Sequence, residues 1–309
     1  LLDHPAVRVE PDWVTLSSYL STIRVTLDDR TMYAGIRTLR PGERIEFDLS
    51  ETVPRRRHAM DPRLASIWPD RDPESIARVV AGEAAESAEQ AATDTMRRIV
   101  ADSVRRHAAA ADVPVGAMLS GGLDSSIICR ELRDAGGPVT SWCATGPEED
   151  AGGDGAHAAM MAAAIDADHH RVSVDRERFR ERWPWMIQRL GLPLGTPNEV
   201  AIHAVAESAR DRVGVLLSGE GADELMAGYD ATVATIMREC RDAALGGRPR
   251  SATSRLLDQI SWVPVAVKDR VLTPACHEAA AGDGHLLEHL GLATAAADRS
   301  PADPRPLLS

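Results

Sequence analysis

The chain has 309 residues, which is enough for about two domains of roughly 150 residues. Its 47 acidic side chains outnumber 35 Lys and Arg, so the net charge of −12 excludes general nucleic-acid binding, because a phosphate backbone would be repelled. No run of eighteen apolar residues could cross a membrane, and four cysteines in a chain of this length do not indicate a disulfide framework. We therefore expect a globular cytoplasmic protein with no membrane or nucleic-acid partner. Every Lys or Arg position is Arg except Lys268.

The N-terminal part of the chain predicts a β-hairpin followed by a linker. Strand-like segments over residues 31–39 and 44–47 flank the turn pair Pro41-Gly42. Residues 51–73 are rich in Pro, Arg and Asp and show little periodicity, which is typical of a surface connection. We therefore place a domain boundary within this connection, with residues 1–60 in one unit and 61–309 in the other.

From about residue 73 onward, helical segments alternate with short apolar runs. The first helix carries apolar side chains on one face, at Met96, Ile99, Val100 and Val104. Strands are predicted over residues 113–119, 139–144, 171–174 and 213–217, and helices over residues 125–135, 155–165 and 199–210. This alternation predicts an α/β fold, a doubly wound parallel sheet with helices on both faces. Ligands of such folds bind at the carboxyl ends of the strands, so the loops there are the candidate sites.

The first candidate loop, Ser120 to Ser126, reads Ser-Gly-Gly-Leu-Asp-Ser-Ser and leads directly into a helix. Two glycines allow a sharp turn, and the backbone N–H groups, the serine hydroxyls and the helix N-terminus all favour an anion. The pattern therefore predicts a phosphate-binding loop, although not a Walker A loop, which would need a lysine. An Asp in such a loop repels phosphate unless a divalent cation bridges the two, so Asp124 implies Mg²⁺. From this loop alone, a strand-to-helix turn capped by Asp124 and Ser125 is an open alternative.

The second candidate loop follows the last predicted strand and reads SGEGADELMAGY from Ser218 to Tyr229. It holds three carboxylates within five residues, on Glu220, Asp223 and Glu224, next to glycines at the end of a strand. Such a set is typical of a metal and substrate site, and the alternative is a solvated acidic turn.

The pair of motifs, SGGLDSS and SGEGADELMAGY about a hundred residues later, resembles the asparagine synthetase family of glutamine-hydrolysing type. The synthetase domain of that family is a pyrophosphate-loop ATP pyrophosphatase with an adenine nucleotide alpha hydrolase-like fold. DVPVGAMLSGG resembles the first strand of that domain, ADHHRVSV the third, and TMYAGIRTLRPGERIEFD the closing hairpin of the family's glutaminase domain. The resemblance implies that residues 1–60 are the tail end of a glutaminase-like domain, and that residues 61–309 are the ATP-binding synthetase domain, truncated at its C-terminal end.

The resemblance also implies a reaction and its residues. A carboxylate attacks the α-phosphorus of ATP, pyrophosphate leaves, and ammonia or an amine attacks the acyl-adenylate, as in an ATP-dependent carbon–nitrogen ligase. Asp124 and Asp223 would bind Mg²⁺, and Glu220 would orient or deprotonate the amine; these three are the implied catalytic residues. The residues implied to bind ATP are Met118, Ser120, Gly121, Gly122, Leu123, Asp124, Ser125, Ser126, Thr145, Asp154, Ser218 and Gly219. Relatives that close β-lactam rings carry Tyr at the position of Glu220, so Glu220 favours aspartate as the acid and ammonia as the nucleophile.

The chain also departs from the family pattern. Full-length members begin with a catalytic Cys and this chain begins with Leu1, so we expect no glutaminase activity from it and a glutaminase domain or subunit as a partner. The family's phosphate-contacting lysine lies in a C-terminal segment that this chain does not resemble, so we expect Lys268 to be a surface residue. The four cysteines, Cys129, Cys143, Cys240 and Cys276, lie mostly at core-like positions. The sequence leaves open whether the protein is a homodimer.

Several alternatives compete with the ligase interpretation. Gly153 to Ala158 matches the dinucleotide pattern GxGxxA, with Asp175 where a ribose-binding acid would fall, but an acidic stretch precedes it. His285 to His289 matches the zinc-peptidase pattern HxxEH without an evident third ligand, which favours an ordinary helical face. Within the family, the chain could instead be a macrolactam- or β-lactam-forming synthetase resembling lasso-peptide cyclases, or a non-catalytic subunit of a split synthetase.

Overall fold

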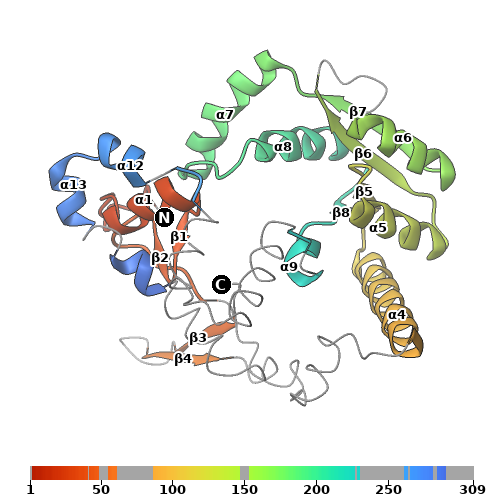
Figure 1. Ribbon diagram of the computed structural model, residues 1–309, viewed down its shortest axis with the longest axis horizontal. Helices are drawn as coiled ribbons and strands as arrows, with labels where there is room; N and C mark the ends of the chain where they lie inside the picture. The colour runs from red at the N-terminus through yellow and green to blue at the C-terminus, as the bar shows by residue number, and fades with distance from the viewer. Residues whose placement is uncertain are drawn as a thin grey trace, which may run out of the picture. The chain divides into compact units, whose positions relative to one another are not determined.

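The computed structural model describes residues 2–40, 42–48, 55–60, 86–146, 153–226, 228–229, 261–263, 265–280 and 284–289. The chain divides into two compact units (Figure 1). We call residues 84–229 the central unit, and residues 1–83 together with 230–309 the terminal unit. The assignment of residues 1–60 to a glutaminase-like tail stays a prediction.

The central unit is built on a four-stranded parallel sheet in the order β7-β6-β5-β8. The strands are β5 (Val115–Met118), β6 (Thr140–Thr145), β7 (Asp168–Ser173) and β8 (Val215–Leu217). The helices are α4 (Glu86–Ala110), α5 (Leu123–Asp134), α6 (Asp154–Ala164), α7 (Arg176–Leu190), α8 (Asn198–Ala209) and α9 (Ala222–Met226). The predicted doubly wound parallel sheet with flanking helices is therefore confirmed (Figure 1).

The strand order places a topological switch point next to β5. From β5 the chain adds β6 and then β7 on one side, and it returns to add β8 on the other side. Loops after β5 and β8 therefore leave the same edge of the sheet from neighbouring strands. In doubly wound sheets this is where ligands bind.

The two faces of the sheet carry separate apolar clusters. One contains Ala117 and Cys143 with residues of α4, α5 and α6, and the other contains Trp142 with residues of α8. Cys143 and Trp142 are consecutive, and successive strand residues point to opposite faces, so helices cover the sheet on both sides. Gly116 makes room for the indole, since a Cβ there would lie 2.5 Å from Trp142 Cζ3.

Helix α4 departs from the predicted pattern in one respect. Its apolar face packs into the cluster at Val100 and Val104, but Met96 and Ile99 are 46% and 54% exposed. Only the C-terminal half of the predicted apolar face is therefore buried among the described residues.

The terminal unit combines segments from both ends of the chain. Its elements are α1 (Trp13–Thr22), β1 (Thr26–Leu27), β2 (Arg30–Thr31), β3 (Glu43–Asp48), β4 (Arg55–Met60), α12 (Val265–Val271) and α13 (Pro274–Ala279). Asp12 caps α1, because its Oδ1 accepts a hydrogen bond from the Thr15 N–H at 2.9 Å, and its Oδ2 pairs with Arg30 at 2.7 Å. Burial opposes ionisation of Asp12, but the hydrogen bonds from Thr15 and Arg30 and the charge of Arg30 outweigh it and lower its pKa.

The predicted hairpin is wrong in its pairing. A strand does cover residues 43–48, but its antiparallel partner is β4, in the stretch that composition assigned to a linker, and not residues 31–39. The register aligns Glu46 with Arg57 and Asp48 with Arg55. The beginning of the segment 31–39 instead contributes to the short β1-β2 pair.

The expectation that Lys268 is a surface residue is also wrong. Its side chain is 2% exposed, and its Nζ donates a hydrogen bond to Ser21 Oγ at 3.1 Å. Helices α12 and α1 pack together, and the buried side of α1 carries hydroxyls, at Thr15, Ser17, Ser18 and Ser21. A polar helix face can accept an ammonium group that an apolar face would exclude.

No helix in the described parts of the chain is long and apolar enough to span a membrane.

Candidate functional site

The loop after β5 turns sharply against the start of α6. Gly121 has φ +83, and a Cβ on it would lie 2.6 Å from the Ala158 N and 2.9 Å from the Asp154 O. Both the backbone conformation and the close approach therefore require glycine at this position. The loop that was predicted to bind phosphate thus packs against the helix that begins with Asp154.

A serine pair holds this loop in shape. Ser125 Oγ accepts a hydrogen bond from the Ser120 N–H at 3.2 Å, donates to the Gly122 O at 3.2 Å, and lies 3.0 Å from Ser120 Oγ. The N–H groups of Leu123, Asp124 and Ser125, at the start of the twelve-residue helix α5, have no acceptor among the residues described. Free donors at a helix N-terminus form an anion-binding site.

The loop after β8 lies directly against the first loop. A Cβ on Gly219 would lie 3.1 Å from both Asp124 Cβ and the Ser125 N, so only glycine allows this approach without displacement. Gly221 follows with φ +91 and turns the chain into α9. The structure therefore brings the two predicted motifs together at the switch point between β5 and β8, although about a hundred residues separate them in the sequence.

The carboxylates of this site differ in their partners. Glu224 accepts a hydrogen bond from the Tyr229 hydroxyl, which lowers the pKa of Glu224 and raises that of Tyr229 to about 12. The carboxylates of Asp124, Glu220 and Asp223, in contrast, have no hydrogen-bond or ion-pair partner within the described residues. These three carboxylates are therefore available to a cation that binds beside the first loop.

The donor set fits a magnesium ion that is shared with a phosphate ligand. Mg²⁺ is commonly held by one or two carboxylates together with phosphate oxygens and water. Asp124 and Asp223 provide such carboxylates, and the free N–H groups of α5 provide donors for the phosphate. Within the described ranges no group of three or more His, Cys, Asp or Glu could hold a metal by itself. The protein residues therefore suit a cation only when a phosphate completes its coordination.

The other residues predicted for the site lie around the same edge. Ser218 directly follows β8, Met118 ends β5 and packs toward the cluster of Trp142, and the buried Thr145 ends β6. Asp154 is the first residue of α6, and its carbonyl lies beside Gly121. These positions share the carboxyl edge of the sheet. Their roles in ligand binding stay predictions.

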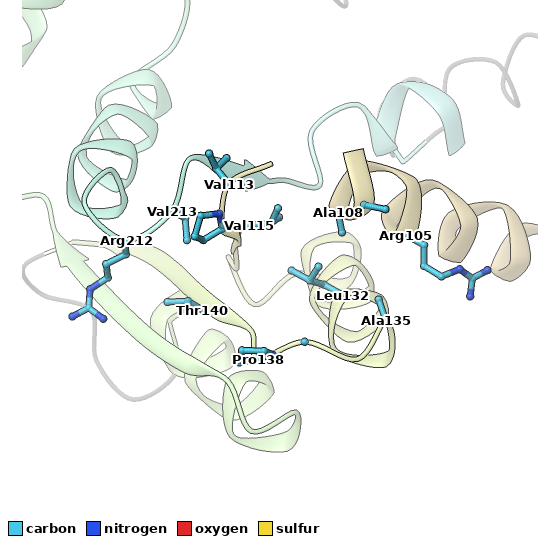
Figure 2. Close-up of a pocket in the computed structure, with 13 residues that line it drawn as sticks. Arg105, Ala108, Val113, Val115, Leu132, Ala135, Pro138, Thr140, Arg212 and Val213 are labelled. Atoms are coloured by element: carbon cyan, nitrogen blue, oxygen red, sulfur yellow. The ribbon is translucent and has the colours of Figure 1, made fainter. Parts of the chain in front are cut away.

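A cavity of about 630 Å³ lies at the opposite edge of the sheet (Figure 2). Leu132, Val115 and Val213 belong to its largely aliphatic lining, while Arg105 and Arg212 lie on opposite sides with their guanidinium groups directed outward (Figure 2). The cavity is adjacent to the beginnings of β5, β6 and β8, so it does not overlap with the paired loops.

The competing motifs find structural explanations. Asp175, the candidate ribose ligand, is the N-cap of α7, because its Oδ1 accepts a hydrogen bond from the Arg178 N–H at 2.8 Å. His285 and Glu288 lie on one helical turn, with His285 Nδ1 3.9 Å from Glu288 Oε2. Sequence reasoning missed Gly228 and Tyr229, which close the acidic loop. The available signal was the Gly-Tyr pair that ends the motif SGEGADELMAGY.

The central unit is thus a doubly wound α/β domain in which the N-terminus of α5, with its free N–H groups, lies against an acidic loop. The family model described as asparagine synthase matches residues 95–295, more than half of the chain. The chain belongs to the asparagine synthase family.

Individual proteins show the same relationship. A Mycobacterium tuberculosis protein whose name describes a glutamine-hydrolyzing asparagine synthetase is 32% identical over 232 residues, 74% of this chain and 32% of that protein. The amidase chyE of Penicillium rubens is 28% identical over 252 residues, 76% of this chain and 34% of that protein. The chain thus spans about a third of the length of these relatives. A solved NMN synthetase structure from Francisella tularensis matches with 14% identity and a TM-score of 0.34, over 44% of this chain and 58% of that one.

Proposed function

We propose that this chain is the synthetase part of an ATP-dependent carbon–nitrogen ligase of asparagine synthetase type. The observation that carries the proposal is the packing of Gly219 against Asp124 and Ser125, which makes the anion-binding loop and the acidic loop two walls of one site. Membership of the asparagine synthase family supports it. The proposed acid is aspartate and the proposed nucleophile is ammonia, which a glutaminase domain or subunit would supply.

In this proposal the protein residues bind ATP and stabilise the leaving group. The N–H groups at the start of α5 and the loop from Ser120 to Ser126 bind the pyrophosphate portion, and one such donor contributes about 3 kcal/mol in comparable oxyanion sites. Asp124 and Asp223 bind Mg²⁺, which supplies positive charge next to the phosphates when it is bound. Met118, Thr145, Asp154, Ser218 and Gly219 surround the adenosine end.

The bond changes follow from this arrangement. A carboxylate oxygen of the acid attacks the α-phosphorus, and the bond from this phosphorus to the pyrophosphate oxygen breaks. Ammonia then attacks the carbonyl carbon of the acyl-adenylate, AMP leaves, and Glu220 accepts a proton from the nitrogen. Glu220 suits this role because its carboxylate is exposed and makes no hydrogen bond or ion pair with any residue that the structure describes.

The experiment that tests the proposal measures pyrophosphate release from Mg-ATP with aspartate, with and without ammonia, against a panel of other carboxylic acids. Asp124→Asn should abolish release while the protein stays folded, since the change removes a ligand and no core volume. Asp211→Asn is the matched control, because Asp211 is 88% exposed and pairs with Arg210 on the surface. Unchanged release in the Asp124→Asn variant would show that the loop has been assigned the wrong role.

The same assay separates the alternative functions. Release with another acid, or with a substrate that carries its own amine, would favour a macrolactam- or β-lactam-forming synthetase. Measurable ATP binding without release for any acid would instead favour a non-catalytic subunit.

A further inference from the structure

Two hydrogen bonds tie residues of α9 to Gly228 and Tyr229. The Gly228 N–H donates to the Asp223 O at 3.0 Å, a bond across five residues of the kind that closes the end of a helix. The Tyr229 hydroxyl donates to Glu224 Oε1. The backbone of Asp223 is therefore bonded to Gly228, and the side chain of Glu224 is bonded to Tyr229.

Gly228 also lies directly against the Asp223 side chain. A Cβ on Gly228 would overlap with Asp223 Oδ1, and it would lie 3.0 Å from Asp223 Cγ and 3.2 Å from Asp223 Cα. The φ of Gly228 is not in the left-handed region, so the need for glycine here comes from the neighbouring carboxylate and not from the backbone conformation. The Asp223 carboxylate thus occupies the space that any larger residue at 228 would take.

The three acidic side chains of this loop consequently differ in their hydrogen bonding. Glu224 is engaged by Tyr229, whereas the carboxylates of Asp223 and Glu220 are free of such bonds among the described residues. The bond from Tyr229 lets Glu224 fix the loop that carries Asp223, because hydrogen-bonded neighbours of this kind orient the residues that bind a metal.

We infer that Gly228, Tyr229 and Glu224 are positioning residues that hold the Asp223 carboxylate in its metal-binding position, and that Glu224 itself is not a metal ligand. This inference rests on the proposed function, in which Asp223 binds the cation. Residues that orient metal ligands typically change metal affinity by about 10- to 100-fold when they are replaced.

The test measures Mn²⁺ binding to the full chain in the presence of a non-hydrolysable ATP analogue, using the electron paramagnetic resonance signal of free Mn²⁺. Tyr229→Phe and Gly228→Ala should each weaken Mn²⁺ binding at least about tenfold. Glu224→Gln should stay within about threefold of the unmodified protein, because the amide oxygen still accepts the phenol hydrogen bond. Gly137→Ala is the matched glycine control, since nothing lies within 4 Å of a Cβ there.

A double-mutant cycle separates positioning from a general structural effect. Tyr229→Phe should add nothing in an Asp223→Asn background, because it acts through that carboxylate. Equal losses from Tyr229→Phe in both backgrounds would overturn the inference, as would a loss from Glu224→Gln as large as that from Asp223→Asn. Asp223→Asn with unchanged Mn²⁺ binding would refute the metal assignment of the proposed function, and the inference with it. A loss from Asp223→Asn without one from Tyr229→Phe and Gly228→Ala would refute the inference alone.

Discussion

Replacement of Gly121 by Ala tests whether the phosphate-binding loop is built against α6. Two separate costs add at this position. An L-residue at φ +83 loses about 1–2 kcal/mol relative to glycine. The new methyl group would lie 2.6 Å from the Ala158 N and 2.9 Å from the Asp154 O, and overpacking against backbone typically costs a further 1–3 kcal/mol or so. Gly121→Ala should therefore lower the free energy of unfolding of the central unit by about 2–5 kcal/mol.

Two other glycines separate these costs. Gly136 has φ +99 with nothing within 4 Å of a Cβ, so Gly136→Ala carries the conformational cost alone, about 1–2 kcal/mol. Gly137 has neither a left-handed φ nor a neighbour within 4 Å, so Gly137→Ala should be neutral or stabilise the fold by up to about 1 kcal/mol.

The assay is urea unfolding of the full chain, followed by tryptophan emission, to which the buried Trp142 of the central unit contributes. The expected order of stability is Gly137→Ala, then Gly136→Ala, then Gly121→Ala. If Gly121→Ala and Gly136→Ala are equally stable, the loop does not pack against α6.

Three further predictions concern other parts of the chain. Asp12→Asn should destabilise the protein by about 2 kcal/mol at neutral pH. Folding lowers the pKa of Asp12, so the stability that its carboxylate contributes is present above the unfolded-state pKa and is lost as the pH falls through the folded-state pKa. The urea unfolding curves of the variant and the unmodified protein should therefore converge in acid. Lys268→Ala should cost about 2–4 kcal/mol and Lys268→Met clearly less, because Met keeps most of the buried volume; a melting temperature unchanged by either would mean an exposed side chain. Glu220→Gln should reduce amide formation more than aspartate-dependent pyrophosphate release, and equal losses of both would contradict its role in the amine step.

The sequence predicts the central unit well because its signals are local. The strands and helices from residue 113 to residue 217 are short apolar runs and amphipathic segments bounded by glycine or proline, and each predicted element exists within a few residues of its expected position. Helix α7 was missed because Pro184 lies inside it and its sequence is dominated by charged residues. Its contacts with α8, such as the pairing of Arg178 and Arg182 with Glu207, are tertiary, and no local pattern reveals them.

The errors in the terminal unit share a different cause, which is dependence on distant residues. The burial of Lys268 is decided by Ser21, 247 positions away in the sequence, so no window around Lys268 contains the reason for it. Strand β4 has the charged composition of a linker, and it is a strand because it pairs with β3, which lies outside the segment itself. The exposure of a side chain and the pairing of a strand both depend on a second segment, and the sequence of the first segment does not identify it.

The candidate site depends both on local sequence signals and on the pairing of distant segments. Each loop is recognisable on its own, because the glycines, serines and carboxylates that give it its chemistry are consecutive in the sequence. Their meeting is a consequence of topology, since β8 joins the sheet beside β5 and not beside β7. Had β8 extended the sheet next to β7, the strands preceding the two loops would be separated by β6 and β7, about 14 Å at a normal strand spacing. The same two motifs would then be too far apart for Gly219 to contact Asp124, so the strand order, as much as the motifs, makes a shared cation site between Asp124 and Asp223 feasible.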